Sequence, residues 1–271
     1  MKVVFCIDDN PRYLLLLKVA VRSLRALHGR DVPCLCIYAG KEERVLKTLE
    51  EEAVPLARHR PRLLPELLPH RARRCAGCFL KLELALVPEL EEEDMALYCD
   101  VDVLFHRPIT ELLRLKPQYM GMAREATAPF YHEHQSLDYE FRGRRYAVPM
   151  PFPIWTFSSG VVLFNLRRLR RRGIIDHFLA FSLQNVEVIG NFDQSLLNYF
   201  FGKRITHLPD RWNRPPYQHD CSESAHIVHF HGPKPWDKTA FPDLRINCFE
   251  AMRDIWMQYL REEELEQVMR F

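Results

Sequence analysis

The chain has 271 residues, 47% of them hydrophobic, and a formal net charge of +2 at pH 7. This length allows one large domain with a sizeable core, and so small a net charge gives no reason to expect a nucleic-acid partner. No uncharged apolar run reaches about 18 residues, and Asp8 interrupts the N-terminal segment too early for a signal peptide, so we expect a cytoplasmic protein.

Two compositional features allow more than one interpretation. Cys75 and Cys78 form a Cys-x-x-C pair, but no second pair of zinc ligands follows at a suitable spacing, so two ordinary thiols are favoured. Arginine is clustered within residues 58–74, 142–145 and 167–172. Such stretches are usually solvated faces, with binding of anionic acceptors or of a negatively charged membrane surface as the alternative.

The first fifty residues alternate between two kinds of periodicity. Apolar runs at Val3–Ile7 and Pro33–Tyr38 predict buried strands, and helical spacing at Tyr13–Leu27 and Lys41–Glu52 predicts helices. This alternation indicates an α/β fold, a mainly parallel sheet with helices on both faces. Ligands of such sheets bind at the carboxyl ends of the strands, where Asp8–Asn10 is expected.

The apolar run Ala96–Phe105 contains two carboxylates, Asp100 and Asp102. In an extended strand, residues i and i+2 point to the same side, so both acids would face one point. Two carboxylates without water are costly, and a divalent cation is the common remedy. Spacing alone favours this metal site no more than a strand that ends in a solvated acidic loop.

The middle of the chain is less regular. Proline and arginine in Pro55–Pro69 indicate an irregular connection or a sheet edge, whereas Phe79–Leu90 and Ile109–Leu113 are expected to be helical. Residues 126–153 have no clear periodicity. A loop of that length inside a compact domain is usually functional, so we expect a lid or an acceptor-facing loop.

The following segment returns to strong patterns. Strands are predicted at Phe157–Asn165 and Ile227–Trp236, a basic helix at Leu166–Arg172, and further helices at Ile174–Leu183 and Asn191–Phe200. No internal repeat or flexible linker interrupts them.

The tail predicts one amphipathic helix at residues 247–271, following a main domain at residues 1–246. We favour packing of this helix on the domain. The alternative is contact with a membrane surface through Trp256, Met257 and Leu260.

Five motifs occur in order along the chain. They are Asp-Asp-Asn near the N-terminus, Tyr-x-Asp-x-Asp, a small-small-Gly-Val-x-Leu-x-Asn strand, Asp-Gln at a helix start, and His-Phe-x-Gly-Pro-Lys-Pro-Trp. From about Lys2 to Trp236 the chain resembles glycosyltransferase family 8, retaining sugar transferases that include enzymes of lipopolysaccharide synthesis. The resemblance implies a GT-A fold with a Rossmann-like sheet, so that residues 1–246 would be the glycosyltransferase domain.

The resemblance implies a metal centre formed by Asp100, Asp102 and His229. Two carboxylates and one imidazole suit Mn²⁺, with Mg²⁺ as the alternative. His231 competes with His229 for this role, but the family pattern places the ligand before the aromatic residue.

The resemblance also implies a nucleotide-sugar site. Its expected contacts are the following residues: Asp8 and Asn10 for base and ribose, Lys81, Asp100, Val101 and Asp102 for the donor, and Gly232 and Lys234 for the phosphates. An Asx turn is the alternative for Asn10, and a solvated helix face for Lys81. Lys234 stands one residue closer to Gly232 than in the family pattern.

The expected catalytic pair is Asp193 and Gln194. By resemblance, Gln194 lies nearest the reacting carbon, opposite the leaving group, and Asp193 stabilises oxocarbenium-like charge. Asp193 could also cap a helix. Ser158 stands where the family more usually has asparagine.

Together these features predict a metal-dependent retaining hexosyltransferase that uses UDP-glucose or UDP-galactose and a saccharide or glycolipid acceptor, such as lipopolysaccharide. It would be cytoplasmic or peripheral on the inner membrane face. The alternatives are a catalytically silent sugar-binding protein and, less favoured, a sugar nucleotidyltransferase. The latter needs a glycine-rich basic loop after the first strand, which Asp8–Tyr13 does not offer.

Overall fold

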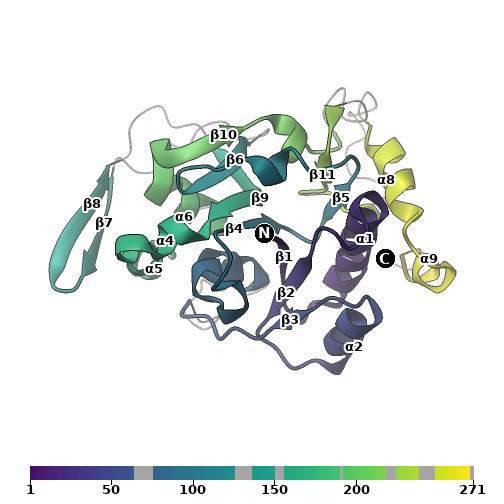
Figure 1. Cartoon of the computed structure of the whole chain (residues 1–271), viewed down its shortest axis with the longest axis horizontal. Helices are drawn as coiled ribbons and strands as arrows, with labels where there is room; N and C mark the ends of the chain where they lie inside the picture. Colours follow the sequence, from purple (N-terminus) through teal and green to yellow (C-terminus); the bar gives the residue numbers. More distant parts are fainter. Residues whose placement is uncertain are drawn as a thin grey trace.

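The computed structural model describes residues 1–63, 76–125, 136–149, 156–189, 192–217, 224–237 and 248–268. Within them, a seven-stranded sheet forms the centre of the molecule (Figure 1). Its strands, in spatial order, are β10 (Ile205–Leu208), β6 (Met120–Arg124), β9 (Phe157–Asn165), β4 (Met95–Cys99), β1 (Lys2–Ile7), β2 (Cys34–Tyr38) and β3 (Leu56–Ala57). Only β9 is antiparallel to its neighbours, which confirms the mainly parallel α/β sheet.

The N-terminal half of the sheet forms as its periodicity predicts. Helix α1 (Pro11–His28) follows β1, and α2 (Glu43–Glu51) follows β2. The side chain of Asn10 caps α1 by accepting a hydrogen bond from the Arg12 amide at 3.1 Å. Proline at the first helical position removes a donor that would have no partner there, so the strand-to-helix turn is encoded locally.

Helices cover both faces of the sheet. Alternate residues of β1 enter opposite cores: Val3 and Phe5 pack with α1, while Val4 packs with a 3₁₀ helix at Ala76–Leu86. The second face is also covered by α4 (Leu166–Arg170), α5 (Ile174–Asn185) and α6 (Phe192–Phe201).

Two predicted helices differ from the expectation. The segment Phe79–Leu90 is a 3₁₀ helix that ends before Pro88, followed by a 3₁₀ turn at Pro88–Leu90. Proline disfavours helical backbone in the residue before it, which explains the break. At Ile109–Leu113, the helical part is a 3₁₀ turn at Leu112–Arg114.

The predicted strand Ala96–Phe105 is two strands. After β4 the chain turns at Val101 and Asp102, and β5 (Val103–Phe105) pairs with β11 (Ile227–His229) in a separate antiparallel sheet. The extended backbone expected through both acids is therefore wrong. The predicted strand at Ile227–Trp236 is likewise shorter, ending at His229.

Part of the predicted loop 126–153 is a β-hairpin. Strands β7 (Ser136–Phe141) and β8 (Arg144–Pro149) pair through a two-residue turn, in which Arg142 and Gly143 both have positive φ. Tyr139 stacks on Tyr146, and β7 packs on α5. The hairpin lies at the end of the molecule opposite the C-terminal helices (Figure 1). The rest of this segment lies outside the described residues.

The tail forms two short helices, α8 (Phe249–Met257) and α9 (Glu262–Val268), instead of one. The side chains of Trp256 and Leu260 are buried in the core beside α1. Two of the three side chains considered for a membrane surface are thus inside the protein. None of the helices in the described part of the chain has the length and apolar character to span a bilayer.

A buried ionic network fastens α9 to α1. Glu264, 2% exposed, accepts from Lys18 Nζ at 2.8 Å and from Arg22 Nη1 at 2.6 Å. Arg22 also contacts Glu52. Burial alone would raise the pKa of Glu264, but the hydrogen bonds from Arg22, the Arg261 amide and Lys18 lower it to about 2.

Replacing Glu264 with glutamine tests this network. Because the pKa of Glu264 is lower in the folded protein, its ionic contribution is complete above pH 5 and is lost as the pH falls towards 2. We expect Glu264→Gln to lower the free energy of unfolding by about 3 kcal/mol at pH 7 and by much less near pH 2.5, measured by urea unfolding. The exposed neighbour variant Glu263→Gln is the control. Equal losses for both variants, or a pH-independent difference, would contradict the assignment.

Candidate active site

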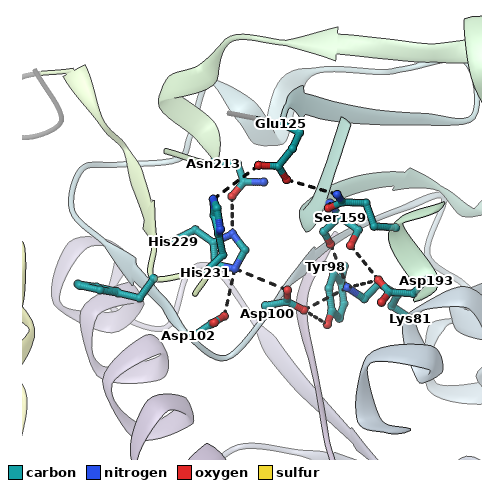
Figure 2. Close-up of polar contacts among 12 residues, drawn as sticks. Lys81, Tyr98, Asp100, Asp102, Glu125, Ser159, Asp193, Asn213, His229 and His231 are labelled. Atoms are coloured by element: carbon teal, nitrogen blue, oxygen red, sulfur yellow. Dashed lines mark hydrogen bonds and ion pairs between the residues drawn. The ribbon is translucent and has the colours of Figure 1, made fainter. Parts of the chain in front are cut away.

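Three ligand groups meet at the carboxyl end of β4 (Figure 2). Asp100 follows β4, Asp102 precedes β5, and His229 ends β11, with one ligand atom from each lying within 4.8 Å of the others. His229 Nε2 is 3.2 Å from Asp102 Oδ1 and 3.7 Å from Asp100 Oδ2. The structure therefore brings together the three residues that the sequence nominated as metal ligands.

Backbone pairing and one glycine place His229. Its strand partner is Val103, and the next residue, Phe230, donates its amide hydrogen to the Asp102 carbonyl at 2.9 Å. The imidazole lies directly against Gly160 of β9, where a Cβ atom would be only 2.0 Å from His229 Cε1. Any side chain at Gly160 would displace the ring.

Lys234 is a cation beside this group. Its Nζ lies 2.6 Å from Asp102 Oδ2 and also donates to the Phe230 carbonyl at 2.9 Å. Gly232 between them has a positive φ of 83°, which returns the chain towards the acids. Burial alone would raise the pKa of Asp102, but Lys234 and His229 hold it well below its usual range.

Lys81 forms ion pairs with two carboxylates, Asp100 after β4 and Asp193 in α6. Its side chain, 1% exposed, lies 3.1 Å from Asp100 Oδ1, 2.9 Å from Asp193 Oδ2 and 3.0 Å from the Ser159 carbonyl. Burial alone would lower the pKa of Lys81, but Asp100 and Asp193 raise it above its usual value. The alternative of a solvated helix face is excluded.

Asp193 and Gln194 begin α6 and face the same strand. Ser159 Oγ donates to Asp193 Oδ2 at 2.8 Å, and the Ser159 amide donates to Gln194 Oε1 at 3.0 Å. One residue of β9 thus positions both expected catalytic side chains.

Sequence reasoning missed several polar residues of this region. Glu125, which follows β6, accepts from Gln194 Nε2 at 3.3 Å and lies 3.8 Å from His231 Nε2. Tyr98 donates to Asp100, and Asn213 contacts His229. Tyr98 is the first residue of the Tyr-x-Asp-x-Asp motif, so its place beside Asp100 could have been predicted from the sequence. No local sequence pattern marks Glu125 or Asn213.

His231 does not belong to the ligand trio. It contacts the Tyr217 hydroxyl at 2.6 Å and lies near Glu125. Burial and the neighbouring His229 lower the pKa of His231 to about 4. Of the two histidines, His229 is the one whose ring nitrogen groups with both acids, so its proposed role as the metal ligand agrees with the geometry.

A pocket of 420 Å³ opens at the carboxyl ends of β1 and β2. Its lining includes Asp8, Asn10 and Tyr38. Asp8 accepts from the Asn10 amide at 3.0 Å and from the Gly77 amide at 3.3 Å, and burial raises its pKa. This volume lies in the range of small-molecule sites.

The pocket and the ligand trio share one edge of the sheet, because β1 and β4 are parallel neighbours. Of the expected nucleotide contacts, Asn10 already uses its side-chain oxygen to cap α1. Val101 is buried at 6% exposure in the apolar core, so a donor contact there would use its backbone.

Solved structures share this fold. The galactosyltransferase LgtC, in complex with donor and acceptor sugar analogs, superposes with a TM-score of 0.73 at 20% identity, covering 99% of this chain and 100% of that chain. Mouse xyloside xylosyltransferase 1 superposes with a TM-score of 0.57 at 18% identity, covering 85% and 97%. The fold is thus that of a GT-A glycosyltransferase.

The family model described as glycosyl transferase family 8 matches residues 2–240, so the chain belongs to that family of glycosyltransferases. Glucoside xylosyltransferase 2 of Xenopus laevis is 28% identical over 203 residues, 67% of this chain and 46% of that protein. Human glucoside xylosyltransferase 1 is 30% identical over 169 residues, 55% of this chain and 36% of that protein. The chain spans less than half the length of these curated relatives.

Removing the Lys81 cation tests how the site is held together. Without it, the carboxylates of Asp100 and Asp193 would lose the buried charge between them. We expect Lys81→Met to lower the free energy of unfolding by about 3–5 kcal/mol in metal-free buffer, measured by urea unfolding. Lys47→Met, at a side chain 74% exposed, is the control and should change it by less than about 0.5 kcal/mol. A Lys81→Met loss no larger than that of the control would show that the bridge does not stabilise the fold.

Proposed function

We propose that this protein is a metal-dependent retaining hexosyltransferase that moves glucose or galactose from a UDP-sugar to a saccharide or glycolipid acceptor. The observation that carries this proposal is the convergence of Asp100, Asp102 and His229 beside Asp193 and Gln194. Family membership and the neighbouring 420 Å³ pocket support it.

The donor set suits a divalent cation. Two carboxylates and an imidazole nitrogen match the oxygen and nitrogen ligands of Mn²⁺, with Mg²⁺ as the alternative. A cation held by these residues would neutralise negative charge that develops on the departing UDP. The Lys234 ammonium, placed beside Asp102, would bind the same diphosphate and exchange one anionic partner for another.

The nucleoside would occupy the pocket at the ends of β1 and β2. The Asp8 carboxylate can accept a hydrogen bond from the base or ribose, and Asn10 can contribute through its backbone or its amide nitrogen. Because this pocket and the acids lie along one sheet edge, a nucleoside diphosphate would extend from the pocket to the trio.

The transferred sugar would then lie over the start of α6. Asp193 supplies a fixed negative charge for an oxocarbenium-like transition state, and the hydroxyl of Ser159 holds that carboxylate in place. The Gln194 amide is oriented by Ser159 and Glu125, which favours an electrostatic role over that of a covalent nucleophile. We therefore propose attack by the acceptor from the side of the leaving group.

The finer features of the substrates are part of the same proposal. A cytoplasmic enzyme, peripheral on the inner membrane face, would have access to a glycolipid acceptor such as a lipopolysaccharide precursor. The names of the curated relatives point instead to xylose, so UDP-xylose belongs in the same assay.

The test is release of UDP from UDP-glucose, UDP-galactose and UDP-xylose, with Mn²⁺ and with excess EDTA. We expect a hexose donor to be used fastest, and EDTA to lower its turnover by about 100-fold or more, which corresponds to several kcal/mol of transition-state stabilisation. Faster turnover of UDP-xylose than of either hexose donor would refute the proposal that glucose or galactose is transferred. Turnover unaffected by EDTA would refute the metal, and UDP binding without turnover by any donor would indicate a silent sugar-nucleotide-binding protein.

A further inference from the structure

The ring nitrogen of His229 that faces away from the acids has its own partner. His229 Nδ1 lies 2.9 Å from Asn213 Oδ1, while Nε2 faces Asp102 and Asp100 (Figure 2). Both side chains are buried, Asn213 at 4% exposure and His229 at 4%. The imidazole is therefore held between an amide on one side and two carboxylates on the other.

The chemistry of the amide decides which nitrogen carries the hydrogen. A carbonyl oxygen only accepts, so the contact with Asn213 Oδ1 requires a hydrogen on Nδ1. With a hydrogen on Nδ1, the ring is either an imidazolium, whose Nε2 hydrogen faces the two carboxylates, or a neutral imidazole, whose Nε2 lone pair faces them. The neutral form is repulsive unless a cation sits between the nitrogen and the carboxylates, and it is the form that a metal ligand needs.

The Asn213 side chain takes part in no second polar interaction among the described residues. Its amide nitrogen is buried and has no hydrogen-bond partner in the described part of the chain, so the side chain is not part of another polar network there. An unpaired buried donor costs free energy, and a purely structural position would be served as well by an apolar residue of the same shape. Among the described residues, the hydrogen bond that the Asn213 side chain makes is the one to His229 Nδ1.

The backbone fixes Asn213 beside His229. The Asn213 amide donates to the Asp210 carbonyl at 2.9 Å. The next residue, Arg214, exchanges backbone hydrogen bonds with β11: its amide donates to Ile227 at 3.0 Å, and its carbonyl accepts from His229 at 2.9 Å. The ring also packs against Gly160, where an added Cβ atom would lie 2.0 Å from His229 Cε1. The amide therefore meets the imidazole in a constrained geometry.

We propose that Asn213 is a positioning residue of the metal centre, which keeps the hydrogen on His229 Nδ1 and directs Nε2 between Asp100 and Asp102. This inference rests on the proposed function, because it presupposes that the trio binds a divalent cation. Loss of the hydrogen-bond partner of a metal-ligating histidine typically lowers metal affinity or activity by 10- to 100-fold.

The test measures the dissociation constant of Mn²⁺ by electron paramagnetic resonance, in the presence of saturating UDP. Asn213→Leu keeps the shape but cannot accept, and should weaken Mn²⁺ binding by about 10- to 100-fold. Asn213→Asp keeps the acceptor and should stay within about threefold of the unaltered protein. At saturating Mn²⁺, the kcat of Asn213→Leu should equal that of the unaltered protein. The variant would then need a higher Mn²⁺ concentration to reach the same turnover.

Asn185→Leu is the matched control. Asn185 is another buried asparagine, hydrogen-bonded to the Asp138 and Phe181 carbonyls. It should leave the Mn²⁺ dissociation constant unchanged. The inference is overturned if Asn213→Leu binds Mn²⁺ like the unaltered protein, if Asn213→Asp is as weak as Asn213→Leu, or if Asn185→Leu is equally weak.

A measurement on the unaltered protein does not depend on any variant folding. Nitrogen-15 spectra of its histidines, assigned for residue 229 with a His229→Gln variant, should show a hydrogen on Nδ1 both without metal and with Mg²⁺ and UDP. An Nδ1 without hydrogen in the metal-free protein overturns the inference alone. Failure of the unaltered protein to bind Mn²⁺ at all overturns the proposed metal centre, and the inference with it.

Discussion

The ammonium group of Lys81 is the contact on which the rest of the site depends. It lies between Asp100, at the end of a sheet strand, and Asp193, at the start of a helix about ninety residues later in the chain. Carboxylates shielded from water need a compensating charge, and Lys81, at 1% exposure, supplies it inside the protein. Lys234, at 26% exposure, pairs with Asp102. The site is thus a set of acids held in place by two cations, with one further cation implied where His229 and the two acids converge.

The mixed topology of the fold serves this arrangement. An all-parallel sheet would bring Asp8 and Asp100 to one edge, but the antiparallel strand β9 adds Ser159 and Gly160 across that edge. The Ser159 amide and hydroxyl donate to Gln194 and Asp193, and the missing side chain of Gly160 leaves space for the His229 imidazole. The small residues of this strand are therefore required by contacts made from three other elements.

Sequence patterns predicted what is local. The capped turn from β1 into α1 and the order of the first strands and helices follow from apolar spacing and from Asn10. The convergence of His229 with two acids was predicted by resemblance, not by spacing, and the structure bears out the proximity. The geometry behind the spacing argument was nevertheless wrong, since the chain turns at Asp102 and enters a second sheet. Glu125 and Asn213 could not be predicted, because their positions depend on pairings between distant segments and no local pattern accompanies them.

We propose that Asp100, Asp102 and His229 form a divalent-cation centre that binds a nucleoside diphosphate. Anomalous diffraction from crystals grown with Mn²⁺ and UDP tests it most directly. We expect one manganese peak bound by both carboxylates, by His229 Nε2 and by oxygens of the diphosphate. A manganese ion bound only to UDP, or a peak elsewhere with Lys234 still paired to Asp102, would contradict it.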